Sequence, residues 1–343
     1  MKICQIVASS GSGGLEKHVL ELCNEMAKTE QVSLIAPPEM REQLASAVTF
    51  IPIDFNRSRY HPLLLWDVLR AIRAGDFDIV HSQASKASSV LATLQAWIPG
   101  VTVGTIHNNK AQRAALFAKL SAVIAVSHGA SAIIPKSVPV SVVYNGVKTP
   151  EVGNAYNKGQ LCALFNIDRH KPLLCSVARL VPAKGFDLLI EAMAGVDANL
   201  LIVGDGILQD TLQAQIDRLQ LQTQVKLAGH RNDALALMAG VDGVIIASRN
   251  EGFSYVFAEA LLLGKAILST DVPVANEILD SALIMPKNAE SIRAKLNEWV
   301  FAPAIWHQRM APAWACAQEK FSLEAMAANT LAVYRTTLTK RGA

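Results

Sequence analysis

Short apolar runs alternate with amphipathic helical stretches along almost the whole chain, and this alternation constrains the fold more than any other feature. In the first half, the strand candidates are residues 2–8, 32–36, 48–53, 78–83, 101–107, 122–127 and 140–145. In the second half, they are residues 172–178, 198–203, 225–228, 243–248, 266–269 and 282–285. Strands that alternate with helices are typical of parallel sheets covered on both faces. We therefore expect an α/β fold with Rossmann-like, doubly wound parallel sheets.

The alternation breaks once, at residues 146–160, a polar stretch with three glycines and one proline. Such a composition is typical of a linker between domains. We therefore expect an N-terminal Rossmann-like domain over 1–150 and a C-terminal Rossmann-like domain over 151–320. From residue 289 onward the pattern is helical only. We expect the last helix, within 321–343, to return to the N-terminal domain.

Hydrophobic residues make up 51% of the 343, enough for two buried sheets. We find no uncharged apolar stretch long enough to span a membrane. Only a seven-residue apolar run precedes the first glycine loop, so we expect no signal peptide. The five cysteines are scattered, without CxxC spacing, which argues against zinc and favours a reducing compartment. The sequence thus indicates a cytoplasmic protein.

Positive charge is concentrated in the N-terminal half. Residues 1–150 hold 14 Lys and Arg against 10 Asp and Glu, a net +4, whereas the remainder carries −1. The excess is sharpest within 55–119. Such a surface fits an anionic partner, and we expect peripheral binding to the inner face of a bacterial cytoplasmic membrane rather than nucleic acid. A merely solvated basic face is the alternative.

A glycine-rich loop, residues 9–14, lies between the first predicted strand and helix. Its Gly13 and Gly14 would let the backbone approach a ligand, and a helix N-terminus favours anions. The loop is not a dinucleotide fingerprint, because Glu16 stands where GxGxxG requires glycine. We expect the loop to face a phosphate or sugar, and a simple tight turn is the alternative.

Ligands of open parallel sheets bind beyond the carboxyl ends of the strands, and two motifs lie there in the C-terminal half. Arg179 and Lys184 follow strand 172–178, where they can bind a diphosphate. Glu251 follows strand 243–248 and can accept hydrogen bonds from hydroxyls. The amides of Gly252, Phe253 and Ser254 precede a helix that contains Glu259, and they suit an anion. Separate salt bridges and a capped helix with exposed glutamates are the alternatives.

Two further features concern histidine and aspartate. His107 ends strand 101–107, where it could donate to a sugar hydroxyl or carry a proton, and His81 is a weaker candidate of the same kind. Asp76 and Asp78 match a DxD string of the kind that holds a divalent metal in some enzymes. They precede a strand, so they should lie at the amino edge of the sheet, away from the ligand. We expect no metal there.

Together these motifs resemble the retaining glycosyltransferases of family 4, which have the GT-B fold. The specific match is the E-x7-E signature, here Glu251 to Glu259, with ARLVPAKG, IVGDG and GGLEKH in the family's order. The resemblance implies two domains that face a cleft, with the N-terminal domain (1–150) on the acceptor side and the C-terminal domain (151–320) binding the nucleotide sugar. It implies a nucleotide-sugar donor, most simply a UDP-sugar, and no metal or other cofactor. It also implies a glycan or glycolipid acceptor, such as lipopolysaccharide core.

The resemblance also implies roles for individual residues. Arg179 and Lys184 would hold the diphosphate, which Gly13 and Gly14 would approach. Glu251 and His107 would act at the reacting sugar, and Glu259 would hold the ribose. The remaining donor-binding residues would be Gly204, Gly252, Phe253 and Ser254. The chain departs from the family at 271–277, where a glycine pair often stands.

Two alternatives share this donor site. One is a GT-B-fold nucleotide-sugar epimerase, which would need no acceptor. The other is a catalytically silent nucleotide-sugar-binding protein, although such a protein would be expected to have lost Arg179, Lys184 or Glu251.

Overall fold

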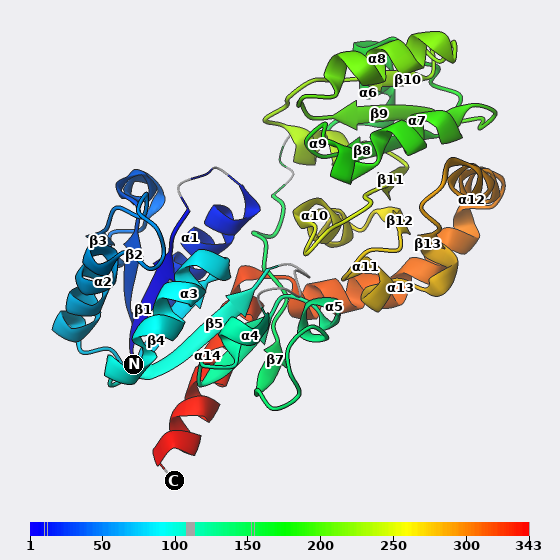
Figure 1. The fold of residues 1–343 in the computed structure, drawn as a ribbon. Coiled ribbons are helices and arrows are strands. Elements are labelled where there is room, and N and C mark those ends of the chain that lie inside the picture. The colour runs from blue at the N-terminus through cyan, green and yellow to red at the C-terminus, as the bar shows by residue number, and fades with distance from the viewer. Residues whose placement is uncertain (10, 12, 108–113, 152, 154, 343) are drawn as a thin grey trace. The chain divides into compact units, whose positions relative to one another are not determined.

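The computed structural model describes residues 1–343 except 10, 12, 108–113, 152, 154 and 343. The chain forms two compact units, Met1–Gly146 with Lys320–Ala343, and Val147–Glu319. Each unit is built on one parallel sheet with helices against it, which confirms the α/β prediction (Figure 1). In the part of the chain that the structure describes, no helix is both long and apolar enough to cross a bilayer.

The N-terminal unit has a seven-stranded sheet in the order β3-β2-β1-β4-β5-β6-β7. The strands are β1 Lys2–Val7, β2 Gln31–Ala36, β3 Thr49–Pro52, β4 Ile79–Gln83, β5 Val101–Ile106, β6 Ala122–Ala125 and β7 Val140–Val142. Strand β1 is central, with Ile3 opposite both Val32 and Ile79. The chain order reverses between β1 and β4, so their carboxyl ends form the switch point where such sheets bind ligands.

Helices cover this sheet because their apolar positions recur at helical spacing. In α1 (Gly14–Met26), Val19, Leu22 and Met26 are buried on one face, as the sequence predicts. The other helices are α2 Pro62–Gly75, α3 Ala84–Leu94, α4 Ala114–Phe117, α5 His128–Ser131 and α14 Leu323–Gly342, with 3₁₀ turns at Pro38–Gln43 and Gln95–Trp97.

Helix α14 belongs to the N-terminal unit although it ends the chain. It packs against α1 and adds Met326, Leu331 and Tyr334 to the core around Ile3. Each fully buried apolar side chain of this size contributes about 1.5–3 kcal/mol. The chain passes close to itself here, because a Cβ on Gly146 would lie 2.4 Å from the carbonyl oxygen of Ser322. Glycine at 146 therefore permits the return of the C-terminal segment.

The C-terminal unit has a six-stranded sheet in the order β10-β9-β8-β11-β12-β13. Its strands are β8 Leu173–Val177, β9 Asn199–Val203, β10 Val225–Leu227, β11 Gly243–Ile246, β12 Ala266–Thr270 and β13 Ile284–Met285. Its helices are α6 Lys158–Phe165, α7 Phe186–Met193, α8 Gln209–Arg218, α9 Ala234–Ala239, α10 Tyr255–Leu262, α11 Ala275–Ile278, α12 Ala289–Phe301 and α13 Pro303–Lys320, with 3₁₀ turns η4 Pro182–Lys184 and η5 Ser281–Leu283. The switch point lies between β8 and β11.

Candidate active site

Two loops meet at the switch point of the C-terminal unit, one after β8 and one after β11. The amide of Arg249 donates to the carbonyl of Ala183 over 2.8 Å. The guanidinium of Arg249 makes two bonds of 2.6 Å to the carboxylate of Asp187, and these bonds hold the pKa of Asp187 below its ordinary value. Arg249 therefore connects the two loops, a role that the sequence did not predict.

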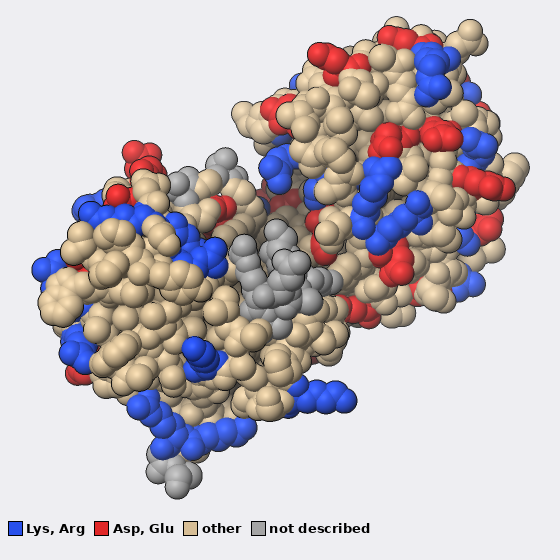
Figure 2. Space-filling view, viewed as in Figure 1, with Lys and Arg blue, Asp and Glu red and all other residues tan. Residues whose placement is uncertain are grey.

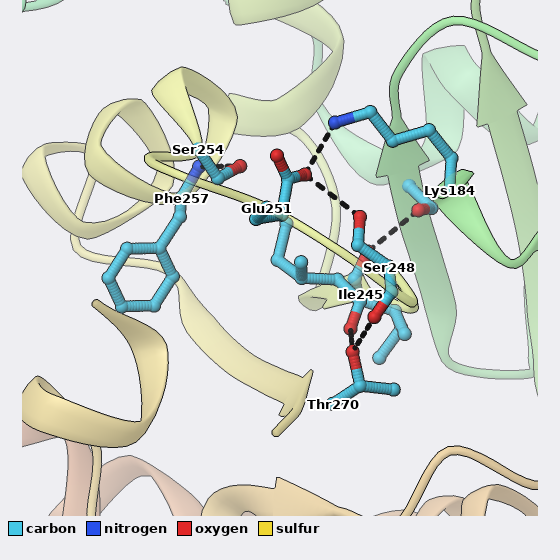
Figure 3. A network of polar contacts seen from close by, with 9 residues as sticks. Lys184, Ile245, Ser248, Glu251, Ser254, Phe257 and Thr270 are labelled. Atoms are coloured by element: carbon cyan, nitrogen blue, oxygen red, sulfur yellow. Dashed lines mark hydrogen bonds and ion pairs between the residues drawn. The ribbon is translucent and has the colours of Figure 1, made fainter. Parts of the chain in front are cut away.

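The contacts of Arg249 hold the two loops so that Lys184 and Glu251 lie next to each other. The Lys184 ammonium lies 2.5 Å from Oε1 of Glu251, and the hydroxyl of Ser248 donates to the same oxygen over 2.8 Å (Figure 3). The two charged side chains are only 20% and 9% exposed, respectively. A partly buried pair of this kind requires good geometry, since removing either partner leaves a poorly solvated charge.

Thr270, the last residue of strand β12, supports this arrangement. The hydroxyl of Thr270 donates to the backbone carbonyl of Ser248 over 2.6 Å and lies 3.3 Å from that of Ile246. Figure 3 shows Thr270 on one side of Ser248 and Glu251 on the other. Thr270 thus fixes the backbone from which the Ser248 side chain reaches Glu251.

Helix α10 follows the Glu251 loop, as predicted. Ser254 is its N-cap, and its hydroxyl accepts from the amide of Phe257 over 3.3 Å. Glu259 lies half-buried within the helix. Gly252 and Phe253 are also half-buried, between Glu251 and the cap. The loop and the first turn of α10 therefore bring the predicted donor-binding residues of this motif to one end of the sheet.

Arg179 and Gly204 lie at the same edge of the sheet. The Arg179 side chain is exposed directly after β8. Gly204 has φ +139°, and a Cβ there would lie 2.0 Å from the carbonyl oxygen of Ala178. This close approach is itself a reason for glycine, so the packing of the two turns accounts for Gly204. Its contact with a donor stays a prediction.

The loop after β12, where the sequence departs from the family pattern, has unusual backbone geometry. Val274 has φ +71°, a conformation that is rare for a β-branched residue, and its side chain is only 1% exposed. Strained backbone of this kind costs about 1–3 kcal/mol and is often found at functional sites.

In the N-terminal unit, Glu16 occupies the centre of the glycine loop. Its carboxylate accepts from the amide of Gly13 over 3.0 Å and from the hydroxyl of Ser9, and the residue is 7% exposed. Gly13 is the N-cap of α1, and Gly14 is its first residue. The position that we expected to attract a phosphate thus already holds a carboxylate, so a phosphate contact at Gly13 would have to displace it or lie beside it.

His107 follows β5 and bonds through Nε2 to Oε1 of Gln83, over 2.9 Å. Its ring meets that of His18 edge-on, with centroids 4.9 Å apart. Burial and the neighbouring histidines His18 and His81 hold the pKa of His107 well below its ordinary value. His107 is therefore neutral near pH 7. Its sequence neighbours 108–113, with Lys110 and Arg113 of the basic stretch, lie outside the described residues.

The structure also shows where His81 and the DxD string, the two weaker candidates from the sequence, are located. His81 is fully buried, bonds to Tyr334 and Thr105, and has a pKa lowered by burial to about 3. Asp78 precedes β4, and its carboxylate accepts from the amide of Lys2 at the start of β1. The DxD string therefore lies at the amino edge of the sheet, on the side opposite to the ligand end.

Comparisons with known proteins agree with this architecture. Residues 12–151 match the family model described as Glycosyltransferase Family 4, and residues 163–311 match the one described as Glycosyl transferases group 1. A phosphatidyl-myo-inositol mannosyltransferase from Mycobacterium leprae is 25% identical over 95% of this chain and 94% of its own length. The lipopolysaccharide core biosynthesis glycosyltransferase LpsE from Rhizobium meliloti is 25% identical over 75% of this chain and 76% of its own.

Among solved structures, HepE from Anabaena in complex with UDP has the same fold. Its TM-score is 0.84 at 20% identity, and the similarity covers 98% of this chain and all of HepE. The two matched domain types and the two parallel sheets identify the chain as a glycosyltransferase of the GT-B fold.

Proposed function

We propose that this glycosyltransferase moves a sugar, with retention of anomeric configuration, from a nucleoside-diphosphate sugar to a glycan or glycolipid. The contact between Lys184 and Glu251 at the C-terminal switch point carries the proposal. A cation beside a carboxylate suits a ligand with both a diphosphate and hydroxyl groups. Relatives along most of the chain are named transferases, so neither an epimerase nor a silent binding protein is favoured.

In this proposal, the exposed guanidinium of Arg179 and the ammonium of Lys184 bind the donor diphosphate. Glu251 and the amides that follow it hold the transferred sugar, while Glu259 holds the ribose. His107 contacts a hydroxyl group of a sugar. Negative charge grows on the diphosphate as the glycosidic bond breaks, and the two cations stabilise it. A donor phosphate oxygen takes the proton of the attacking hydroxyl. Because Arg179 and Lys184 supply the positive charge at the diphosphate, the proposal includes no metal.

The donor in this proposal is a UDP-sugar. The Anabaena protein of the same fold was solved with UDP, and the relatives of this chain include a glycosyltransferase named for lipopolysaccharide core biosynthesis. The acceptor is a bacterial glycan or glycolipid, such as lipopolysaccharide core, made at the inner face of the cytoplasmic membrane.

An exposed face on α2 supports an anionic membrane surface as a partner. Leu63 and Trp66 in the first turns of this helix are 54% and 63% exposed, and Tyr60, just before it, is 60% exposed. Arginines lie beside them in the chain, at positions 57, 59, 70 and 73. On the face shown in Figure 2, Lys and Arg outnumber Asp and Glu over the N-terminal unit. Aromatic side chains with basic neighbours are typical of surfaces that rest on anionic lipid headgroups.

Donor screening tests the proposed function directly. The melting temperature is measured with UDP-, GDP- and ADP-sugars, because a ligand at a hundred times its Kd stabilises the folded protein by about 2.7 kcal/mol. The best donor is then incubated with candidate acceptors, and the anomeric configuration of the product is read by NMR. An inverted product, or isomerisation of the donor without any acceptor, would contradict the proposal.

A further inference from the structure

A chain of buried polar side chains runs through the N-terminal unit to His107. It starts at Tyr334 on α14, passes through Gln5 on β1 and Gln83 at the end of β4, and ends at His107. The three bonds between these residues measure 2.8, 2.9 and 2.9 Å in that order. Tyr334, Gln5 and Gln83 are each at most 1% exposed. Buried groups of this kind are costly unless every bond is made, so their orientations are constrained.

The direction of each bond follows from the orientations of the two glutamine amides, Gln5 and Gln83. The side-chain nitrogen of Gln5 lies 3.2 Å from Nδ1 of His81, and an amide nitrogen only donates, so Nδ1 accepts. The Tyr334 hydroxyl, 2.5 Å from the same Nδ1, accepts from Gln5 and therefore donates its own proton to His81. The proton of His81 is then on Nε2, which donates to the hydroxyl of Thr105 over 2.7 Å.

The same reasoning extends to His107. The side-chain oxygen of Gln5 accepts from the nitrogen of Gln83, so the oxygen of Gln83 faces His107. An amide oxygen only accepts, and His107 must therefore carry its proton on Nε2. All six bonds run in one direction, from His107 toward Thr105, an arrangement in which each bond polarises the next.

We propose that Gln83 is a positioning residue that holds His107 as the Nε2–H tautomer, so that the Nδ1 lone pair accepts a hydrogen bond from a hydroxyl of the bound sugar. This inference rests on the proposed function for the identity of the ligand. It assigns His107 the role of an acceptor, whereas the sequence left donation open. An unprotonated ring nitrogen repels anions, so the group that it meets is a neutral hydroxyl rather than a phosphate.

The backbone next to Gln83 supports a dedicated role for this residue. Ala84, which follows it, has φ +60°, a left-handed conformation that costs a residue with a Cβ about 1–2 kcal/mol. The turn that positions Gln83 is thus held against strain. The titratable groups that act on His107 among the described residues are His18 on α1 and His81 on β4, and both stay neutral because they are buried.

NMR of the full-length protein labelled with ¹⁵N-histidine tests this inference without any donor. In the wild type, the Nδ1 and Nε2 shifts of His107 should be those of a neutral Nε2–H ring from pH 5.5 to 8. Gln83→Met should release the ring to both tautomers and lower kcat about tenfold, the usual effect of one lost hydrogen bond. Gln83→Glu keeps an acceptor but adds charge, so it should raise the pKa of His107 and make transfer decline as pH falls.

Gln224→Met is the matched control. This glutamine also makes hydrogen bonds within the protein, to the backbone carbonyls of Val196 over 2.6 Å and Ala198 over 2.7 Å, but it lies in the other unit. It should change stability without changing the His107 shifts. A wild-type His107 that is protonated on Nδ1 or charged at pH 7, or a tautomer unchanged in Gln83→Met, would overturn the inference. Failure of the proposed transfer reaction would leave these spectra unaffected.

Discussion

Gly185 lies against the backbone of Ala247 so closely that a Cβ at position 185 would be 2.1 Å from the Ala247 carbonyl oxygen. Gly185 also has φ +67°, a conformation that favours glycine. Gly185 directly follows Lys184, and Ala247 directly follows strand β11, which leads to Glu251. The two halves of the proposed donor site are therefore positioned by a backbone contact that no other residue type permits.

Replacing Gly185 by alanine should destabilise the C-terminal unit and lower activity. The new Cβ adds left-handed strain to a clash with backbone, which together cost about 2–4 kcal/mol. For a unit of this size, the melting temperature should fall by about 5–10 °C in calorimetry. Gly195→Ala is the control, because Gly195 has φ +88° but no atom within 4 Å of its Cβ position. Equal losses in the two variants would show that the contact with Ala247 has no effect.

Lys184→Ala and Glu251→Ala should each lower kcat/KM by about a hundredfold or more, the scale of one lost charge-stabilising contact. The double variant should lose less than the sum of the two, because the partners are in direct contact. Lys295→Ala removes a comparable ion pair, Lys295 with Glu298 at 2.8 Å, on α12. It should leave transfer unchanged. Near-normal turnover by either single variant would contradict the assignment.

The sequence predicted the strands well because their signal is local. Each of the thirteen expected apolar runs overlaps a strand of the structure, from β1 at Lys2–Val7 to β13 at Ile284–Met285. Continuous apolar runs are what a sheet buried on both faces requires. Eleven strands are shorter than the expected run, whereas β2 and β12 each extend one residue beyond it, at Gln31 and Thr270. The rule that places ligands at carboxyl ends drew attention to Lys184 and Glu251, and the structure brings their side chains into contact. Their role in binding a donor stays a prediction.

The sequence did not predict contacts between residues far apart in the chain. Gln5 and Tyr334 are separated by 329 positions, and no periodicity connects them. A glutamine within the apolar run of β1 was the available signal, because a polar side chain in a buried strand needs a partner. The occupation of the glycine loop by Glu16 was also missed. The GxGxxG comparison treated this glutamate only as a missing glycine.

Membrane docking through α2 is tested with vesicles that contain phosphatidylglycerol. Trp66→Ala and the pair Arg70→Glu with Arg73→Glu should weaken binding in a flotation assay, by about 1 kcal/mol for each basic residue lost near the surface. Wild-type binding should also weaken as salt rises. Phe301→Ala, at an 86% exposed aromatic on α12, is the control and should bind normally. Binding that is insensitive to salt and to these variants would exclude this surface.

The buried histidines should make the N-terminal unit sensitive to acid, and His18 allows the cause to be isolated. Burial lowers the pKa of His18 from 6.5 to about 4, and neither ring nitrogen has a hydrogen-bond partner among the described residues. Since the unfolded chain binds the proton first, stability is complete above pH 6.5 and declines as pH falls from 6.5 to 4. The loss attributable to His18 is about 3 kcal/mol.

His18→Leu keeps a buried apolar side chain and removes the titration, so its melting temperature should fall less between pH 7 and pH 4.5. His170→Leu, at an exposed histidine, should follow the wild type. Parallel curves for His18→Leu and the wild type would show that His18 is accessible to protons in the folded state, contrary to its burial.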